Sequence, residues 1–291
     1  MARVSSYARR VSLVLATFSL VACAETSPTP SEAPAATGAL PAEGPVPLVV
    51  PDRATIPEGP LGDAIRRGEE IVTRTRETLP EHVGNDLHCT SCHLQGGTVA
   101  NAGPWVGITA VFPEYRSRNG RVNTIEQRIN DCFERSMNGT ALDPASEEMA
   151  AIVAYMTWLS RGVPIGREVE GRGFRRIANA PTPDRARGQQ LYATRCAVCH
   201  GENGEGRAGP DGAYQFPPLW GERSYNLGAG MARLDTAAAF VRWNMPLGQG
   251  GTLTDQEAYD VADYFIHGDR PTFARQSEDW PNGGRPRDAR Y

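Results

Sequence analysis

One five-residue motif, Cys-x-x-Cys-His, occurs twice in this chain of 291 residues, at residues 89–93 and 196–200. Each copy follows a stretch with helical spacing of apolar residues and precedes an Ala-Gly-Pro and then a Phe-Pro. Each repeat also closes in an amphipathic segment, with Asp143 expected to cap it in the first repeat and a Thr254/Glu257 capping box in the second. The sequence therefore predicts a tandem repeat of one small helical domain.

The spacing within the motif indicates covalently bound haem. Two thiols three positions apart on one turn can add to the two vinyl groups of a haem, while the adjacent histidine points at the iron. A thioredoxin-type pair would need no histidine, and a four-cysteine zinc site would not explain the repeated Ala-Gly-Pro. We expect two haem c groups, held by Cys89, Cys92 and His93 and by Cys196, Cys199 and His200.

The proline of each Ala-Gly-Pro has an expected role beside the haem. Its carbonyl oxygen could accept a hydrogen bond from Nδ1 of the motif histidine and so fix the ring. This predicts bonds from His93 to Pro104 and from His200 to Pro210.

An export signal opens the chain. Three arginines precede a twelve-residue apolar run at 11–22, which is too short to cross a bilayer that needs about 20 residues. The sequence Leu-Val-Ala-Cys at 20–23 resembles a lipobox, in which Cys23 becomes the lipidated first residue; ordinary cleavage after Ala24 is the alternative. We favour the lipoprotein, and so expect a periplasmic protein that meets the membrane only through a lipid anchor at Cys23.

Composition divides the rest of the chain and limits its partners. All 30 basic residues are arginines and the formal net charge is −4, so no nucleic-acid partner is expected. The last segment is a polar tail, which we expect to be extended unless it packs across the other repeat. The expected segments are a signal peptide (1–22), a flexible Pro- and Ala-rich tether (23–60), the first repeat (61–162), a linker (163–183), the second repeat (184–268) and the tail (269–291).

Each haem iron needs a second ligand on its other face. In the second repeat Met245, in a Pro/Gly loop, is favoured over Met231, because a rigid loop can hold a thioether against iron. In the first repeat no methionine occupies the equivalent loop, which leaves Cys132 or Met137. Met149 and Met156 are interpreted instead as the buried stripe of the closing helix, and His88 as too close to Cys89 to reach over the haem.

Cys132 lies on a predicted helix that opens with the capping pair Asn123 and Glu126 and stops at Asn138-Gly139. Arg128, Cys132 and Ser136 are four residues apart and share one face. A thiolate ligand lowers the potential of a haem, and a neighbouring arginine favours the thiolate, which is unlike a simple electron carrier. A free buried cysteine on a solvated charged helix is the alternative interpretation.

These residues resemble the dihaem thiosulfate dehydrogenases, whose two halves are class I cytochrome c domains. The resemblance implies an all-α fold of two such domains, a catalytic first haem ligated by His93 and Cys132, and an electron-transfer haem ligated by His200 and Met245. Some relatives carry a lysine as alternative ligand where this chain has Asn244. The match is carried by residues 85–89, 96–98, 128–136, 228–233 and 244–248.

The implied reaction oxidises two thiosulfates to tetrathionate, in a direction that depends on the haem potentials. Arg118 and Arg128 would bind sulfonate oxygens, and Ser136 would donate a hydrogen bond. Our hypothesis is that Cys132 leaves the iron, bonds to a sulfane sulfur and is released by the second thiosulfate, as in disulfide exchange. The usual electron acceptor in such a family is a small cytochrome c or a high-potential iron–sulfur protein. The alternatives are a dihaem electron carrier without a substrate and a haem peroxidase, for which the first repeat offers no obvious distal histidine.

Overall fold

The computed structural model describes residues 44–210 and 214–291. The expected signal peptide, Cys23 and the first part of the expected tether lie outside these residues. Among the helices described, none is long and apolar enough to cross a membrane.

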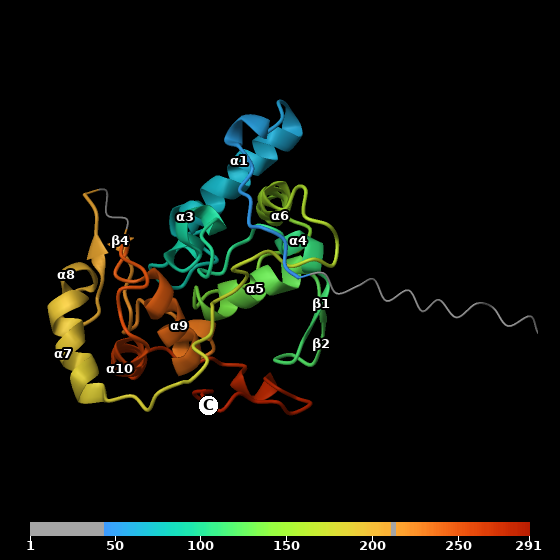
Figure 1. The fold of residues 1–291 in the computed structure, drawn as a ribbon. Helices are drawn as coiled ribbons and strands as arrows, with labels where there is room; N and C mark the ends of the chain where they lie inside the picture. The colour runs from blue at the N-terminus through green and yellow to red at the C-terminus, as the bar shows by residue number, and fades with distance from the viewer. Residues whose placement is uncertain (1–43, 211–213) are drawn as a thin grey trace, which may run out of the picture. The chain divides into compact units, whose positions relative to one another are not determined.

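Short helices joined by long loops make up both repeats (Figure 1). The first part contains η1 (Arg53–Thr55), α1 (Pro60–Thr73), α2 (Thr75–Thr78), η2 (Cys89–Ser91), α3 (Leu94–Gly97), α4 (Ile108–Val111), β1 (Glu114–Arg116), β2 (Arg121–Asn123), α5 (Ile125–Arg135) and α6 (Glu147–Leu159). The second contains α7 (Arg185–Arg195), α8 (Ala197–His200), β3 (Arg207–Ala208), β4 (Tyr214–Phe216), η3 (Gly230–Ala232), α9 (Leu234–Asn244), α10 (Asp255–Ile266) and η4 (Gln276–Glu278).

The first and last helices of each repeat pack together in the same way, α1 on α6 and α7 on α10. A glycine lies at each crossing: a Cβ on Gly68 would lie 2.0 Å from the carbonyl oxygen of Ala151, and one on Gly188 would lie 2.0 Å from that of Asp260. Only a residue without a side chain allows backbones so close. The matched crossings support the predicted tandem repeat.

Helix caps agree with the expectation in the second repeat and differ in the first. Thr254 and Glu257 form the predicted capping box of α10. Helix α5 is capped by Thr124, whose hydroxyl accepts from the Gln127 amide at 3.4 Å, one residue later than predicted. Asn123 does not cap because its side chain is buried and donates to Gln127 Oε1 at 3.2 Å.

The cap of α6 is Ser146 rather than the predicted Asp143. The Asp143 carboxylate accepts from the Ala145 amide at 2.9 Å and shapes the turn before the helix. Met149 and Met156, 0% and 5% exposed, lie in the first core as predicted.

Two antiparallel pairs of short strands, β1–β2 and β3–β4, are added to the expected helical fold. In the first hairpin Arg116 pairs with Arg121, so the intervening turn presents residues 117–120. Helix α5 follows directly and lies between this hairpin and the second repeat (Figure 1). The Asn226 amide of the second repeat donates to the carbonyl oxygen of Arg135 at 3.2 Å. The hairpin and the second repeat thus flank the helix that carries Cys132.

The tail packs across the first repeat, as the sequence allowed. The Trp280 amide donates to the carbonyl oxygen of Arg118 at 2.6 Å, and Figure 1 shows the tail, in red, beside the β1–β2 hairpin. Part of the expected tether is also paired: Val46 exchanges main-chain hydrogen bonds of 2.8 Å with Glu168 and Glu170 of the expected linker. The Pro-rich composition suggested a free tether, but these bonds use main-chain atoms and so do not depend on which side chains the segment carries.

Candidate functional site

The first pocket is built around His93. Nδ1 of its ring lies 2.6 Å from the carbonyl oxygen of Gly103, and the ring packs against Trp105 with centroids 4.8 Å apart. Burial lowers the pKa of His93 to about 4, so the imidazole is neutral at pH 7. With Nδ1 bound to a carbonyl, Nε2 is the nitrogen available to a metal.

The same pocket brings together most of the residues predicted for the first site. Its walls are otherwise mainly apolar, as a haem requires. It is lined by Val72, Leu87, His88, Cys89, Cys92, His93, Trp105, Ile129, Cys132, Phe133, Ser136, Met137, Ile152, Met156, Tyr225 and Met231. Both candidates for the second ligand, Cys132 and Met137, are therefore present.

Helix α5 places Arg128 directly against Cys132. Nη1 of the arginine donates to Sγ at 2.8 Å, across one helical turn. The negative charge of a Cys132 thiolate is the largest influence on the Arg128 guanidinium and raises its pKa. Ser136 continues the same face by one more turn and lines the pocket. The predicted alignment of these three residues is therefore found in the structure.

Arg118 has a different environment from Arg128. Its Nη1 donates to the carbonyl oxygen of Gly228 at 2.6 Å, and Nε lies 3.4 Å from Oδ2 of Asp279. It is not among the residues that line the first pocket. Burial lowers its pKa, as does the neighbouring positive charge of Arg135.

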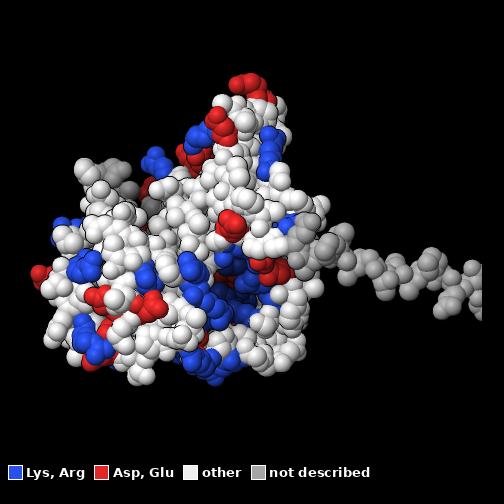
Figure 2. Space-filling model, in the orientation of Figure 1, with Lys and Arg blue, Asp and Glu red and all other residues white. Residues whose placement is uncertain are grey.

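Basic side chains gather in a hollow near the middle of the face drawn in Figure 2. Burial lowers the pKa of Arg116, and the positive charge of the nearby Arg128 lowers it further. Arg172 belongs to the same group and pairs with Glu114 at 3.0 Å. More arginines than carboxylates near α5 make the region attractive to anions.

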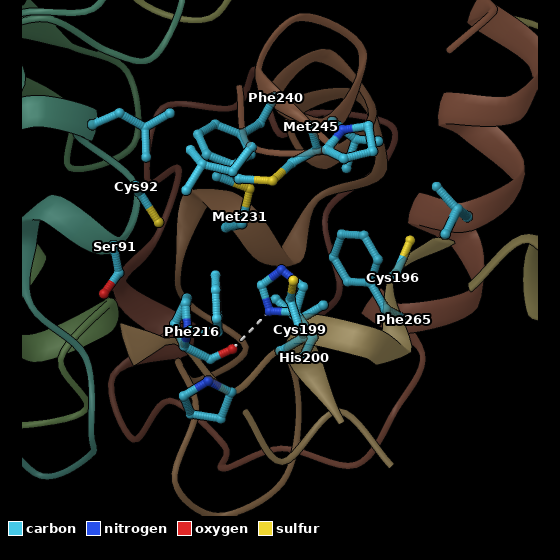
Figure 3. A pocket seen from close by; sticks show the side chains of 18 of the residues that line it. Ser91, Cys92, Cys196, Cys199, His200, Phe216, Met231, Phe240, Met245 and Phe265 are labelled. Carbon is cyan, nitrogen blue, oxygen red and sulfur yellow. Dashed lines mark hydrogen bonds between the residues drawn. The ribbon is translucent and has the colours of Figure 1, made fainter. Parts of the chain in front are cut away.

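The second pocket is built around His200, whose Nδ1 lies 3.0 Å from the carbonyl oxygen of Pro217. Cys196 and Cys199 line it, and Figure 3 shows Met231 and Met245 on the side opposite the histidine. Both methionines predicted as alternatives for the second ligand thus reach the cavity.

The predicted acceptors of the two histidine bonds were wrong. Gly103 and Pro217 accept them, rather than Pro104 and Pro210. Gly103 adopts φ of 62° and approaches His93 so closely that a Cβ would lie 3.0 Å from Nδ1. The turn therefore presents the glycine carbonyl, whereas the second repeat uses its Phe-Pro segment.

Buried hydrogen-bond donors that have no protein partner indicate whether a haem could occupy these pockets. Within the described residues they include Tyr225 Oη, Arg233 Nε and Arg270 Nε. Buried polar atoms are normally hydrogen-bonded, and haem carries two propionates that accept such bonds. Of these donors Tyr225 lines both pockets, and together with the paired cysteines and neutral histidines it fits a haem c in each. No short motif marks them in the sequence, so they were not predicted.

The two pockets are adjacent. Leu87, Cys92, Tyr225 and Met231 line both of them. Met231 therefore lies in a common wall, as well as opposite His200.

Comparison with known proteins agrees with the fold and the pockets. Residues 81–165 match the SoxA/TsdA cytochrome c domain, and residues 185–267 match the cytochrome c family. The fold and its two pockets define a dihaem c-type cytochrome.

The relatives are more specific. A thiosulfate dehydrogenase from Psychrobacter arcticus is 50% identical over 86% of this chain and 76% of its own length. One from Allochromatium vinosum is 47% identical over 80% of this chain and 88% of its own. The solved thiosulfate dehydrogenase of Marichromatium purpuratum is 43% identical with a TM-score of 0.75, covering 79% of this chain, which spans 50% of that longer one.

The chain belongs to the thiosulfate dehydrogenase family. The resemblance seen in the sequence, the two cytochrome c domains and the two haem c groups are thereby confirmed.

Proposed function

We propose that this protein oxidises two thiosulfate ions to tetrathionate at the first pocket and passes the electrons out through the second. The contact between Arg128 Nη1 and Cys132 Sγ, 2.8 Å long and in the pocket of His93, carries the proposal. A guanidinium in that position donates a hydrogen bond to the sulfur and also attracts an anionic substrate. The relatives named as thiosulfate dehydrogenases support thiosulfate as that substrate.

His93 and Cys132 are the proposed ligands of the first haem iron. Met137 reaches the same pocket, but it is 4% exposed within the first core, where a methionine fills space. Cys132 instead has a charged donor on its sulfur, which a buried space-filling cysteine does not need.

His200 and Met245 are the proposed ligands of the second haem iron. Met245 follows α9 at the start of a Pro/Gly loop, and its amide donates to the carbonyl oxygen of Val241 at 3.0 Å. This bond anchors the loop to the helix end, so the thioether has a fixed origin. Met231 belongs to η3 and to the wall between the two pockets.

The chain's own residues perform the sulfur chemistry. Arg128 and Arg118 bind the sulfonate oxygens and Ser136 donates a hydrogen bond to the same anion. The Cys132 thiolate forms a bond with the sulfane sulfur of the first thiosulfate, which releases two electrons. When bound, each haem supplies a one-electron acceptor for this step. A second thiosulfate then attacks the same sulfane sulfur, so tetrathionate leaves and the Cys132 thiolate is restored, protected by Arg128.

Export and partners complete the proposal. The N-terminal segment directs the chain to the periplasm, and lipidation of Cys23 anchors it to a membrane. A small cytochrome c or a high-potential iron–sulfur protein accepts the electrons.

The test is steady-state reduction of ferricyanide by thiosulfate, comparing the dihaem wild type with Cys132→Ala. We expect the variant to load both haems and to lose nearly all activity, because the sulfur–sulfur bond cannot form. Electron paramagnetic resonance should show a thiolate-ligated low-spin haem in the wild type only. Full activity in the variant would refute the role of Cys132. A wild type with no thiosulfate activity and no thiolate signal would favour a simple electron carrier.

A further inference from the structure

The carboxylate of Asp279, in the tail, is buried between two arginines of the first part of the chain. Its side chain is 2% exposed. Arg135 Nη1 and Nη2 donate to Oδ2 and Oδ1 at 2.9 and 2.7 Å, a bidentate pair, while Arg118 Nε lies 3.4 Å from Oδ2. The hydroxyl of Tyr291 also donates to Oδ2. One acidic side chain therefore holds two guanidinium groups that would otherwise repel each other.

Aromatic residues of the same tail cover both arginines. The guanidinium carbon of Arg135 lies 4.0 Å from the centre of the Phe273 ring, and that of Arg118 lies 4.9 Å from the Trp280 ring. The Trp280 amide donates to the main-chain oxygen of Arg118 at 2.6 Å. Each arginine is thus held by charge and by stacking, and Arg118 by its backbone as well.

Arg135 belongs to the helix that carries Cys132, and Arg118 belongs to the hairpin from which the proposed function takes a sulfonate-binding residue. Arg135 ends α5, three residues after Cys132, and its side chain is 8% exposed. Arg118 lies in the turn between β1 and β2. Asp279 therefore joins the hairpin to the helix. Arg135 Nε also lies 3.9 Å from Asp131 Oδ1 on the same helix, so Asp279 is the partner that the two arginines share.

We propose that Asp279 is a positioning residue that acts through Arg118 and Arg135, so that the tail fixes the geometry of the thiosulfate site. This inference rests on the proposed function, which assigns sulfonate binding to Arg118. A side chain held in its binding orientation before the ligand arrives loses less freedom on binding, so the expected effect is on substrate affinity.

The test compares the wild-type dihaem protein with Asp279→Asn, which keeps the size of the side chain and removes its charge. Glu278→Gln is the matched control, because the neighbouring Glu278 side chain is 63% exposed and lies 3.7 Å from the Arg275 guanidinium, away from Arg118 and Arg135. We expect Asp279→Asn to raise the thiosulfate KM about tenfold, the effect of one lost charge-assisted contact, with kcat within about twofold. Glu278→Gln should match the wild type, and Asp279→Glu should restore part of the affinity.

Hydrogen exchange gives a readout that needs no turnover. Amides of α5 should exchange about tenfold faster in Asp279→Asn than in the wild type and in Glu278→Gln, because Arg135 loses its bidentate partner and keeps the longer contact with Asp131. If Asp279→Asn fails to load both haems, Tyr291→Phe, which removes one donor to the same carboxylate, takes its place with a KM increase of about threefold.

The outcomes separate the inference from the proposed function. An unchanged KM, or a fall in kcat alone, in an active enzyme would overturn the positioning role even if α5 exchanged faster. A wild type without thiosulfate activity would defeat the proposed function, and the exchange of α5 would then decide whether Asp279 orders the site: faster exchange supports it and unchanged exchange overturns it.

Discussion

Replacement of Arg128 by alanine should strongly reduce thiosulfate oxidation while leaving the fold intact. Its Nη1 lies 2.8 Å from Cys132 Sγ. A hydrogen bond to a charged group contributes about 1.5–3 kcal/mol, and each 1.36 kcal/mol is a tenfold change in population. Loss of this charge-assisted contact should therefore lower kcat/KM for thiosulfate roughly 10- to 150-fold.

The assay is steady-state ferricyanide reduction by thiosulfate at one fixed pH near neutrality, with both haems loaded in every variant. Arg128→Lys keeps the charge but loses the planar fork, and should be intermediate. Arg121→Ala, on the exposed part of β2, is the control and should behave as the wild type. At least half of the wild-type rate in Arg128→Ala would refute the reasoning.

Three further outcomes are expected. Gly188→Ala should lower the melting temperature in calorimetry, because the new Cβ would lie 2.0 Å from the Asp260 carbonyl oxygen and overpacking costs about 1–3 kcal/mol. Gly230→Ala is the control and should leave the melting temperature unchanged, because its Cβ would meet nothing within 4 Å. Met245→Ala should abolish the His/Met resonance signal of the second haem and Met231→Ala should keep it; the opposite result would exchange the two assignments. Burial lowers the pKa of His88 in the folded protein, so the unfolded chain takes up a proton at a higher pH than the folded protein does. The free energy of unfolding therefore falls as pH drops below about 6.5. His88→Gln should flatten that fall in denaturant unfolding, and an unaltered slope would contradict it.

Local patterns carried most of what the sequence predicts about the fold. The haem motifs, the Thr254 cap and the Met149 stripe depend on residues close in the chain, and all are found in the structure. The histidine acceptors could not be predicted in the same way, because which carbonyl faces a ring depends on how a whole loop turns.

Contacts between distant residues were beyond local reasoning. Arg135 and Asp279 are 144 positions apart, and nothing in the spacing of either indicates the other. The aromatic residues of a largely polar tail, Phe273, Trp280 and Tyr291, were the available signal that the tail is anchored. The partners of Arg118 could not be predicted for the same reason, because they come from the second repeat and the tail.

The common wall of Leu87, Cys92, Tyr225 and Met231 has a consequence for redox titrations of the loaded protein. An electron placed on one side of this shared wall adds negative charge next to the other side, where buried groups are screened poorly by solvent. The second electron therefore enters at a lower potential than the first, whichever centre is filled first. The two midpoint potentials are properties of the pair, and the half-reduced molecule is favoured over an equal mixture of empty and full ones.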